Sequence, residues 1–379
     1  MSGNRIYFPN STQFKRINEN LKAIAGAMNR NIDISTWAGI QKAVRSGIAP
    51  SLLPVGTQLT IEHDDYGVCV YDVVAHDYFK SAIDENAHTM TLMSHEVLPR
   101  IQYDSTEAFY HADEELPAGT YNFDVVSSGG MWMSGTYQFT LDYSVPKGGI
   151  LAISGNYMSY LDTLKVVACR SQTDDFSSEM VAITKGSGGT KLGTIGVELN
   201  HWSRVAYGSD NYKESAIRQF LNSSERMGNV WSPQTKYDRP PIWLTNIDGF
   251  MAGLDDEFLS VVGAVVVPCS SNKMFESQDS TTKPYEQYNV VDKFYPASQQ
   301  EIFGIATDIV EDNSHLLPYY DGATNTERIK YRDDSAVAWR LRTPRNGYGC
   351  NVRLVGTDGT LRNDFANLEY GVAPMCTIV

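Results

Sequence analysis

Residues 339–374 most constrain what this chain can fold into, because two conformationally restricted blocks bracket a segment of different composition. The first block is Trp-Arg-Leu-Arg-Thr-Pro at 339–344, and the second is Tyr-Gly-Val-Ala-Pro at 370–374. Between them, residues 345–369 are rich in Gly, Asn and Asp and hold few large apolar side chains. Such a segment is typical of surface loops and short strands on a rigid scaffold, where binding residues concentrate. The pattern predicts a ligand-binding surface rather than a catalytic centre.

The composition of the whole chain limits its domain count and its partners. With 379 residues, 42% of them hydrophobic, the chain can bury two or three cores, since single domains commonly have ~100–200 residues. A net charge of −14 disfavours binding to nucleic-acid phosphates or anionic lipid. No segment approaches the ~20 apolar residues that cross a bilayer. We therefore expect no nucleic-acid partner and no membrane insertion.

The cysteines and the N-terminus bear on where the protein is made. The five cysteines are widely spaced and form no Cys-x-x-Cys pair, which predicts mostly reduced thiols rather than a disulfide framework or a zinc site. The N-terminus lacks the charged-then-apolar order of a signal peptide. These features predict synthesis in a cytoplasm without a signal peptide.

Two helices are predicted in the N-terminal segment, residues 1–49. Apolar residues recur at helical spacing along residues 14–28, and a second helix is expected from Thr36, with Trp37 and Ile40 on its buried face. Ser35 is the expected cap and Gly47 the expected end of that helix. The first helix either forms a seam in a homo-oligomer or packs on the main body, and the sequence leaves both open.

The rest of the chain divides into a scaffold with an insert. Residues 50–114 are expected to begin the scaffold, with a largely buried strand at 67–77. Residues 115–200 predict an inserted antiparallel β-module, because strand-like runs alternate with Gly-rich turns, and Gly-Thr-Tyr-x-Phe occurs at 119–123 and 135–139. The Gly-rich run 186–191 lacks Gly-Lys-Ser/Thr and predicts a turn rather than a phosphate loop.

Residues 201–379 are expected to complete the scaffold as an α+β domain. Helices are predicted at 213–221 and 253–262, with a weaker one at 299–306, and a β-branched run at 261–268 suits a central strand. The seven histidines and the paired acidic residues have no metal-ligand spacing. We therefore expect no cofactor, while a structural calcium ion stays open.

The C-terminal blocks resemble those of C-type-lectin-fold proteins diversified by retroelements, found in phages and bacteria, of which the phage major tropism determinant is the type example. The likeness is greatest to phage and prophage proteins of gut Firmicutes. It extends to residues 212–222, 250–268 and 292–302. The resemblance implies a C-type lectin-like domain, which is also the fold of formylglycine-generating enzymes, with a variable region at 339–379.

The resemblance further implies a receptor-binding protein of a phage or prophage, located in the virion tail. Its expected partners are a bacterial surface protein or glycan, and other virion tail proteins. A bacterial surface or secreted adhesin of the same fold is an alternative. An oxidative enzyme of the formylglycine-generating or sulfoxide-synthase type is a second, less favoured alternative. The matched cysteine pair and three-histidine iron site of those enzymes are not evident, so we expect no catalytic activity.

The same resemblance assigns the variable positions. Val355 and Leu361 are expected to face the core, so alternation turns every second residue of 350–356 outward. Trp339, Arg342, Tyr370 and Pro374 are expected to form the supporting frame. The predicted binding residues are Arg345, Gly347, Tyr348, Cys350, Val352, Leu354, Gly356, Arg362, Asp364, Phe365, Asn367, Leu368 and Glu369.

Overall fold

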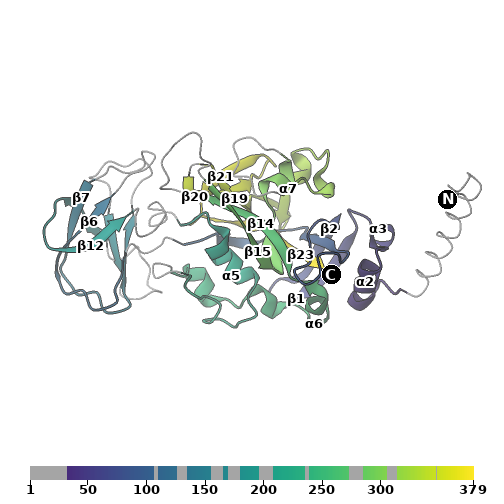
Figure 1. The fold of residues 1–379 in the computed structure, drawn as a ribbon, viewed down its shortest axis with the longest axis horizontal. Helices are drawn as coiled ribbons and strands as arrows, with labels where there is room; N and C mark the ends of the chain where they lie inside the picture. The colour runs from purple at the N-terminus through teal and green to yellow at the C-terminus, as the bar shows by residue number, and fades with distance from the viewer. Residues whose placement is uncertain are drawn as a thin grey trace, which may run out of the picture.

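The computed structural model describes residues 32–105, 110–125, 135–154, 165–169, 180–195, 208–234, 239–272, 285–304, 314–346 and 348–379. Short helices lie at one end of the long axis, a mixed domain lies in the middle, and a β-module lies at the other end (Figure 1). Both helices and sheets contribute to the middle domain, which confirms the predicted α+β class. The helix predicted at 14–28 lies outside the described residues.

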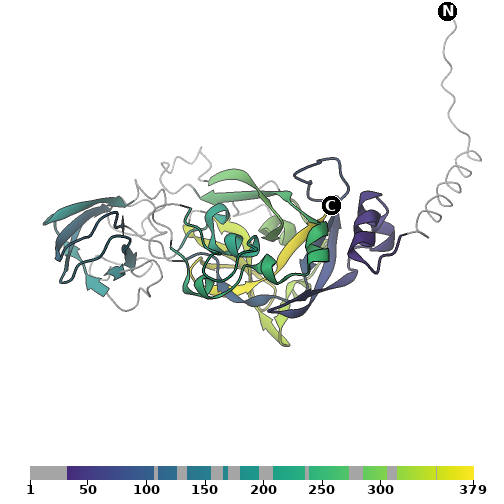
Figure 2. The same ribbon diagram turned by 90° about the horizontal axis from the view of Figure 1, so that it is seen from below.

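The N-terminal helices α2 (Trp37–Arg45) and α3 (Ala49–Leu52) pack on the middle domain. Thr36 caps α2, since its side chain accepts a hydrogen bond from the Gly39 amide, so the expectation of a Ser35 cap was wrong. Ile40 is buried on the inner face of α2 as predicted. The side chain of Gln41 donates to the carbonyl of the last residue, Val379, at 2.8 Å, and Figure 2 shows the C-terminus beside these helices.

The first sheet of the middle domain joins strands from residues 58–94 with strands from the C-terminal part of the chain. Its order is β1-β2-β3-β23-β13, and β16 also pairs with β23. The strands are β1 (Gln58–His63), β2 (Gly67–His76), β3 (Met90–Ser94), β13 (Val262–Gly263), β16 (Phe294–Pro296) and β23 (Pro374–Ile378). Every residue of β3 and β23 is buried, so this sheet is the centre of the core, and β2 confirms the strand predicted at 67–77.

The second sheet carries the C-terminal segment and has the order β21-β20-β19-β22-β4. Its strands are β4 (Leu98–Gln102), β19 (Trp339–Arg345), β20 (Tyr348–Val355), β21 (Leu361–Phe365) and β22 (Glu369–Val372). The β20–β21 connection turns at Gly359, whose φ is 75°. A β-carbon there would lie 1.7 Å from the Asn325 carbonyl oxygen, so the turn requires glycine.

Short helices and two hairpins cover these sheets. The helices are α5 (Ala216–Leu221), α6 (Asp256–Val261) and α7 (Gln299–Phe303), with 3-10 turns η2 (Tyr212–Glu214), η3 (Ile242–Asn246), η4 (Phe250–Gly253), η5 (Pro318–Tyr320) and η6 (Thr326–Arg328). The hairpins are β14 (Val265–Asn272) with β15 (Tyr285–Asp292), and β17 (Lys330–Arg332) with β18 (Ser335–Val337).

The predicted helices were longer than the observed ones, and the predicted run 253–262 contains α6 only at 256–261. The run 213–221 is a 3-10 turn followed by α5, and α7 ends at Gly304 in the left-handed conformation. The prediction of one central strand at 261–268 was wrong. That run breaks at Ala264 into β13, at the edge of the first sheet, and β14, which pairs with β15.

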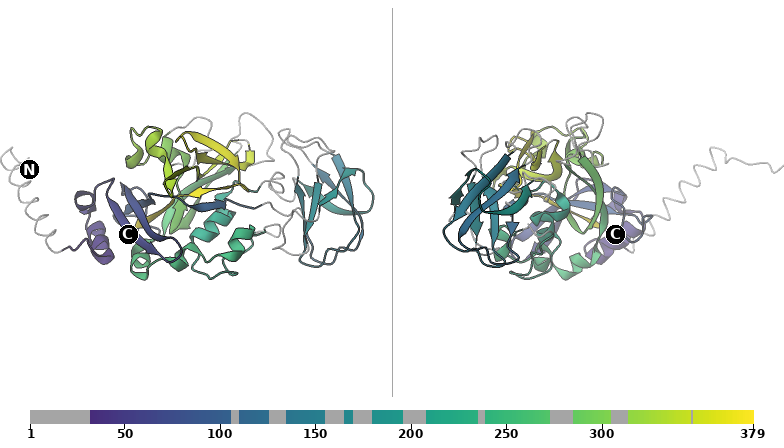
Figure 3. Two further views of the ribbon diagram at one scale, coloured as in Figure 1. Left: turned by 180° about the vertical axis from the view of Figure 1, so that it is seen from behind. Right: turned by 60° about the vertical axis from the view of Figure 1, so that its left-hand side comes forward.

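The β-module consists of two four-stranded sheets, β10-β9-β8-β5 and β11-β7-β6-β12. Its strands are β5 (Tyr110–His111), β6 (Gly119–Val125), β7 (Gly135–Leu141), β8 (Ile150–Ser154), β9 (Lys165–Cys169), β10 (Met180–Ala182), β11 (Thr184–Lys185) and β12 (Thr190–Ile195). Figure 3 shows it apart from the N-terminal helices. All pairs are antiparallel except β12 with β6, which is parallel, so the prediction of an antiparallel module holds for most pairs only.

The repeated Gly-Thr-Tyr-x-Phe runs are the two partners β6 and β7. Tyr121 is opposite Phe139 and Phe123 is opposite Tyr137, with each pair of rings stacked at 5.8 Å. Aromatic cross-strand pairs of this kind stabilise a sheet. In the Gly-rich run 186–191, three main-chain carbonyls accept hydrogen bonds from the Asn122 side-chain amide. This turn is therefore held by hydrogen bonds within the β-module.

Candidate ligand-binding surface

The predicted binding residues separate into buried and accessible groups. Arg362, Leu368 and Glu369 are exposed, and Arg345, Asp364, Phe365 and Asn367 are partly exposed. Gly347 and the side chain of Tyr348 lie outside the described part of the chain. The remaining four predicted positions, Cys350, Val352, Leu354 and Gly356, are buried.

The predicted outward orientation of β20 was therefore wrong. Every residue from Cys350 to Val355 is buried, with at most 6% exposure, so both faces of this strand are covered. Val355 faces the core as predicted. Arg340 stands opposite Leu354 in the register and extends across the other face. The expected alternation of inward and outward residues holds for a strand with one solvent-exposed face. The apolar residues at every second position, Cys350, Val352 and Leu354, were the signal that the second face is also buried.

Arg340 holds the segment that follows β20. This side chain is fully buried, and its guanidinium donates to main-chain carbonyls rather than to a carboxylate. Nη1 donates to Val352 (3.2 Å) and Asp364 (3.1 Å), while Nη2 donates to Phe365 and to Leu368 (3.2 Å). Burial lowers the pKa of Arg340 from 12.5 to about 10, which leaves the group charged at neutral pH. Hydrogen bonds from a charged donor are stronger than neutral ones.

The carbonyls between those contacts are bound from a second side. The Ala366 carbonyl accepts from the N–H groups of residues 103–104 at 3.0 and 3.1 Å, and the Asn367 carbonyl accepts from the Gln102 side-chain amide at 2.7 Å. With the bonds from Arg340, all five carbonyls of residues 364–368 accept hydrogen bonds from the scaffold. The path of this loop, which we call the supported loop, is thus fixed through main-chain atoms.

Two of the predicted frame residues, Trp339 and Arg342, are buried in the middle domain. Trp339 is fully buried, and its indole N–H donates to the Arg328 carbonyl at 3.2 Å. Arg342 forms a two-bond ion pair with Glu301, and both side chains have 0% exposure. Such a pair is stable only where its remaining hydrogen-bonding groups are satisfied, and Arg342 also donates to the Pro268 carbonyl at 2.9 Å.

Tyr370 connects the frame to the loop. Its ring lies under the Arg340 guanidinium, 4.4 Å from the centroid, and its hydroxyl donates to the Asp364 carboxylate at 2.6 Å. Asp364 also accepts from the Phe365 amide at 2.9 Å. The Asp364 carboxylate is therefore occupied by the frame, which leaves Phe365, Asn367, Leu368 and Glu369 as the side chains that the supported loop and the start of β22 present.

The structure does not gather all the accessible residues at one place. Arg362 lies near the β20–β21 turn, where it pairs with Asp358 at 2.8 Å. Arg345 donates to the Asn363 side-chain carbonyl at 3.1 Å, and Asn351 donates to the same oxygen at 3.2 Å. Asn351 and Asn363 were missed because the sequence placed them on the inner face, whereas they share a polar cluster with Arg345.

The β-module is rooted beside the supported loop. The chain enters the module after Ser105, and it returns at Gly208, where a β-carbon would lie 3.2 Å from the Ala366 side chain. The Ser209 amide donates to the Asp104 carboxylate at 3.0 Å, which joins the two connections. In Figures 1 and 3, β20 and β21 lie on the side of the middle domain nearest the module.

The described residues include no group of three or more His, Cys, Asp or Glu side chains that could hold a metal ion. The thiols of Cys69 and Cys376 are free. Burial raises the pKa of Cys376, so this thiol stays protonated and is a poor nucleophile. In the described part of the chain, no helix is long and apolar enough to cross a membrane.

Comparison with known proteins gives one family. Searches of curated proteins and of solved structures give no match. The model of a family described as "Domain of unknown function (DUF6273)" matches residues 182–379. That range covers more than half of the 379 residues and includes both C-terminal blocks, the supported loop and Arg340. The chain belongs to the DUF6273 family.

Proposed function

We propose that this chain is a ligand-binding protein whose supported loop recognises a component of a bacterial surface, either a protein or a glycan. One observation carries the proposal: all five carbonyls of residues 364–368 are bound by the scaffold, through Arg340, Gln102 and the amides of residues 103–104. None of these bonds uses a loop side chain. Exchanging the loop side chains therefore leaves the backbone supports in place, and a pre-ordered backbone reduces the entropy lost on binding.

The setting that we propose is a phage or prophage tail, with a C-type lectin-like domain diversified by a retroelement. The resemblance of the blocks at 339–344 and 370–374 supports this setting, together with the α+β class and the presence of a supported loop between the blocks. Several copies on one particle would compensate for modest affinity at each site. The aromatic and aliphatic side chains of Phe365 and Leu368 would supply contact area.

A substitution test separates binding from folding. Fluorescently labelled full-length protein is added to a panel of bacterial cell types, and bound protein is counted by flow cytometry for wild type, Leu368→Asn and Glu369→Tyr. We expect the pattern of bound cell types to change, while the free energy of unfolding changes by less than about 0.5 kcal/mol, as is usual for exposed positions. Glu62→Tyr is the matched control, since Glu62 is an exposed glutamate on a strand of the other sheet.

The same panel can refute the proposal. If Leu368→Asn, Glu369→Tyr and the Glu62→Tyr control all bind the same cells as wild type, the supported loop is not the recognition surface. Large losses of stability in the two loop variants would contradict the claim that scaffold bonds alone hold the backbone.

A population test addresses diversification directly. The 3′ end of the gene is sequenced deeply in host populations and compared with any near-copy in the same genome. We expect substitutions at Phe365, Asn367 and Leu368, and none at Arg340. Because β20 is buried on both faces, we also expect Val352 to remain apolar. A uniform sequence without a near-copy would overturn the retroelement part of the proposal and leave a binder of fixed specificity.

A further inference from the structure

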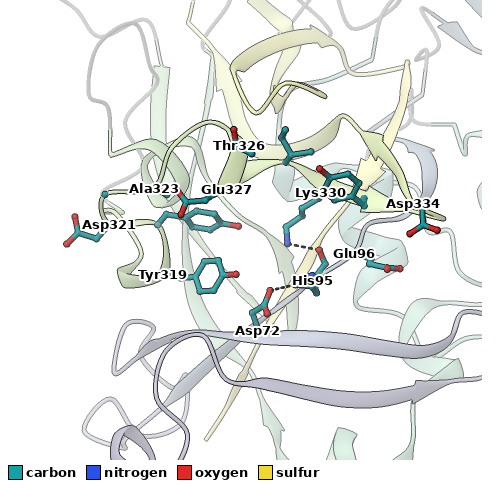
Figure 4. Close-up of a pocket in the computed structure, with 14 residues that line it drawn as sticks. Asp72, His95, Glu96, Tyr319, Asp321, Ala323, Thr326, Glu327, Lys330 and Asp334 are labelled. Carbon is teal, nitrogen blue, oxygen red and sulfur yellow. Dashed lines mark hydrogen bonds and ion pairs between the residues drawn. The ribbon is translucent and has the colours of Figure 1, made fainter.

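A hollow lies away from the supported loop, where the first sheet meets the segment from η5 to β18. Its volume is about 540 Å³, within the usual range for small-molecule sites. It is lined by Asp72, His95, Glu96, Tyr319, Tyr320, Asp321, Gly322, Ala323, Thr326, Glu327, Ile329, Lys330, Tyr331 and Asp334. We call this hollow the acidic cavity, and Figure 4 shows its labelled lining residues.

The floor of the cavity is built around one buried carboxylate, that of Asp72. Asp72 is 2% exposed and accepts from Gln58 at 3.1 Å, and it pairs with His95 at 2.8 Å. Burial and the neighbouring Asp72 carboxylate raise the pKa of the Tyr319 hydroxyl. In Figure 4 the Tyr319 ring and Asp72 face the space at the middle of the cavity. The floor therefore places a partly buried aromatic ring near a buried carboxylate.

The one lysine of the lining does not neutralise the cavity. Lys330 is 5% exposed, and its ammonium donates to the main-chain carbonyls of Ser94 and His95. Burial lowers its pKa to about 8. The neighbouring arginines point elsewhere: Arg328 donates to the Ile302 carbonyl and Arg332 to the Val97 carbonyl. The cationic groups of this region are therefore engaged with main-chain oxygens.

The carboxylates outnumber the cations. Five lining residues are acidic, against Lys330 and the His95 that pairs with Asp72. Within the described residues, Glu96, Asp321 and Asp334 form no ion pair with a lysine, arginine or histidine. In Figure 4 Glu96 and Asp334 lie across the cavity from Tyr319, beyond Lys330 and His95, while Asp321 lies on the opposite side. A negative potential over an aromatic floor favours a cation.

We propose that the acidic cavity binds an organic ammonium cation, in the space between the Tyr319 ring on one side and the carboxylates of Glu96 and Asp334 on the other. An anion is disfavoured, because no free cationic side chain lines the space. A bare metal ion is also disfavoured, since the described residues hold no cluster with metal-ligand geometry. The ammonium belongs either to a free alkyl amine or to the lysine side chain of a peptide, and both have the same head group.

Calorimetric titration of the full-length protein tests the charge preference. The probes are cadaverine, the neutral analogue pentanediol and the anionic analogue glutarate, each at low and at high salt. We expect cadaverine to bind at least about tenfold more tightly than pentanediol, with the advantage reduced by salt, and glutarate not to bind. Equal binding of cadaverine and pentanediol, or binding of glutarate, would overturn the proposal, as would the absence of heat with every probe.

Matched variants test the location. Glu96→Gln combined with Asp334→Asn removes two rim charges, and we expect at least about tenfold weaker binding of cadaverine. Glu62→Gln combined with Glu85→Gln removes the same charge from exposed positions outside the cavity and should change binding by less than about twofold. If both pairs weaken binding equally, the effect is one of net charge, and the cavity is not the site.

The aromatic floor is tested separately. Tyr319→Phe keeps the ring and should retain binding within about twofold, while Tyr319→Leu should weaken it by about threefold or more, the usual size of a cation–aromatic contact. Equal affinities for both variants would refute the ring's role. Blocked lysine, acetylated at its α-amine and amidated at its carboxyl group, then identifies the source. Tighter binding of blocked lysine than of cadaverine indicates a peptide, and the reverse order indicates a free amine.

Discussion

Replacing Arg340 by methionine removes four scaffold bonds at once and keeps most of the apolar side-chain volume. The guanidinium donates to the carbonyls of Val352, Asp364, Phe365 and Leu368. At about 1.5 kcal/mol for each bond from a charged donor, the lower end of the usual range, the four contribute about 6 kcal/mol. Burying the charged group opposes this.

The opposing cost can be read from the pKa of Arg340. The fall from 12.5 to about 10, caused by burial, corresponds to about 3 kcal/mol against the charged form. Methionine does not carry that cost, so the net loss expected for Arg340→Met is about 3 kcal/mol. For a domain of this size the midpoint of thermal unfolding should fall by roughly 6–12 °C.

Calorimetry and amide hydrogen exchange measure the global and local parts of this effect. The Ala366 amide donates to the Cys350 carbonyl and the Leu368 amide to the Phe365 carbonyl. We expect both amides to lose protection in Arg340→Met, with the β14–β15 hairpin unchanged. Arg340→Lys keeps the charge but has fewer hydrogen-bond donors, so its loss of stability should lie between those of wild type and Arg340→Met. Arg362→Met, at an exposed position, is the control, and its free energy of unfolding should change by less than about 0.5 kcal/mol. Unchanged stability together with unchanged protection of residues 366–368 would refute the role assigned to Arg340.

Three further predictions concern the frame, the cavity and the turn. Glu301→Gln leaves the buried Arg342 without its carboxylate and should cost about 3–5 kcal/mol by urea unfolding; the double change Glu301→Leu, Arg342→Met should cost less, and a single change without effect would contradict the pair. The pKa of Lys330 is near 8 folded and 10.5 as its ordinary value, so between these pH values the unfolded state binds more protons. Wild-type stability relative to Lys330→Met should therefore rise by about 3 kcal/mol from pH 8 to 10.5, and a flat difference in denaturant titrations would show that the lysine is solvated. Gly359→Ala and Gly322→Ala share a φ of 75°, but only the first meets a main-chain oxygen. Both variants should lose about 1 kcal/mol of stability, because alanine is disfavoured in the left-handed conformation. Gly359→Ala should lose more than Gly322→Ala, because its β-carbon meets the Asn325 carbonyl oxygen. Equal midpoints of thermal unfolding for the two variants would show that the turn at Gly359 shifts to accept the β-carbon.

Local patterns in the sequence were sufficient for several elements. The β2 strand and the α2 helix follow from apolar spacing within short stretches of chain, and the repeated Gly-Thr-Tyr-x-Phe runs are both strands, as the predicted β-module requires. The frame position of Arg342 was predicted, although its partner Glu301 was not. Glu301 lies 41 residues earlier in the sequence, and no local pattern links two such residues.

Two failures have a common physical origin. The run 261–268 was predicted to be one strand, and β20 was predicted to have one exposed face. In both cases the outcome depends on which distant strands lie alongside: β23 and β15 divide the first run, while Arg340 crosses one face of the second. The alternation of residues along one sequence indicates which side chains share a face of a strand. It does not indicate whether that face is exposed to solvent or covered by another part of the chain.

The supported loop and the β-module have a common root, which has a consequence for binding. The amides of residues 103–104 hold the Ala366 carbonyl, and Asp104 accepts from the Ser209 amide where the chain returns from the module. Displacing the loop therefore requires breaking its bonds to residues 103–104, which lead into the module. A ligand that contacts Leu368 or Glu369 would meet a backbone braced by the module's entry and exit. The ordering of this loop is completed on folding, so little of the binding free energy is lost in arranging it.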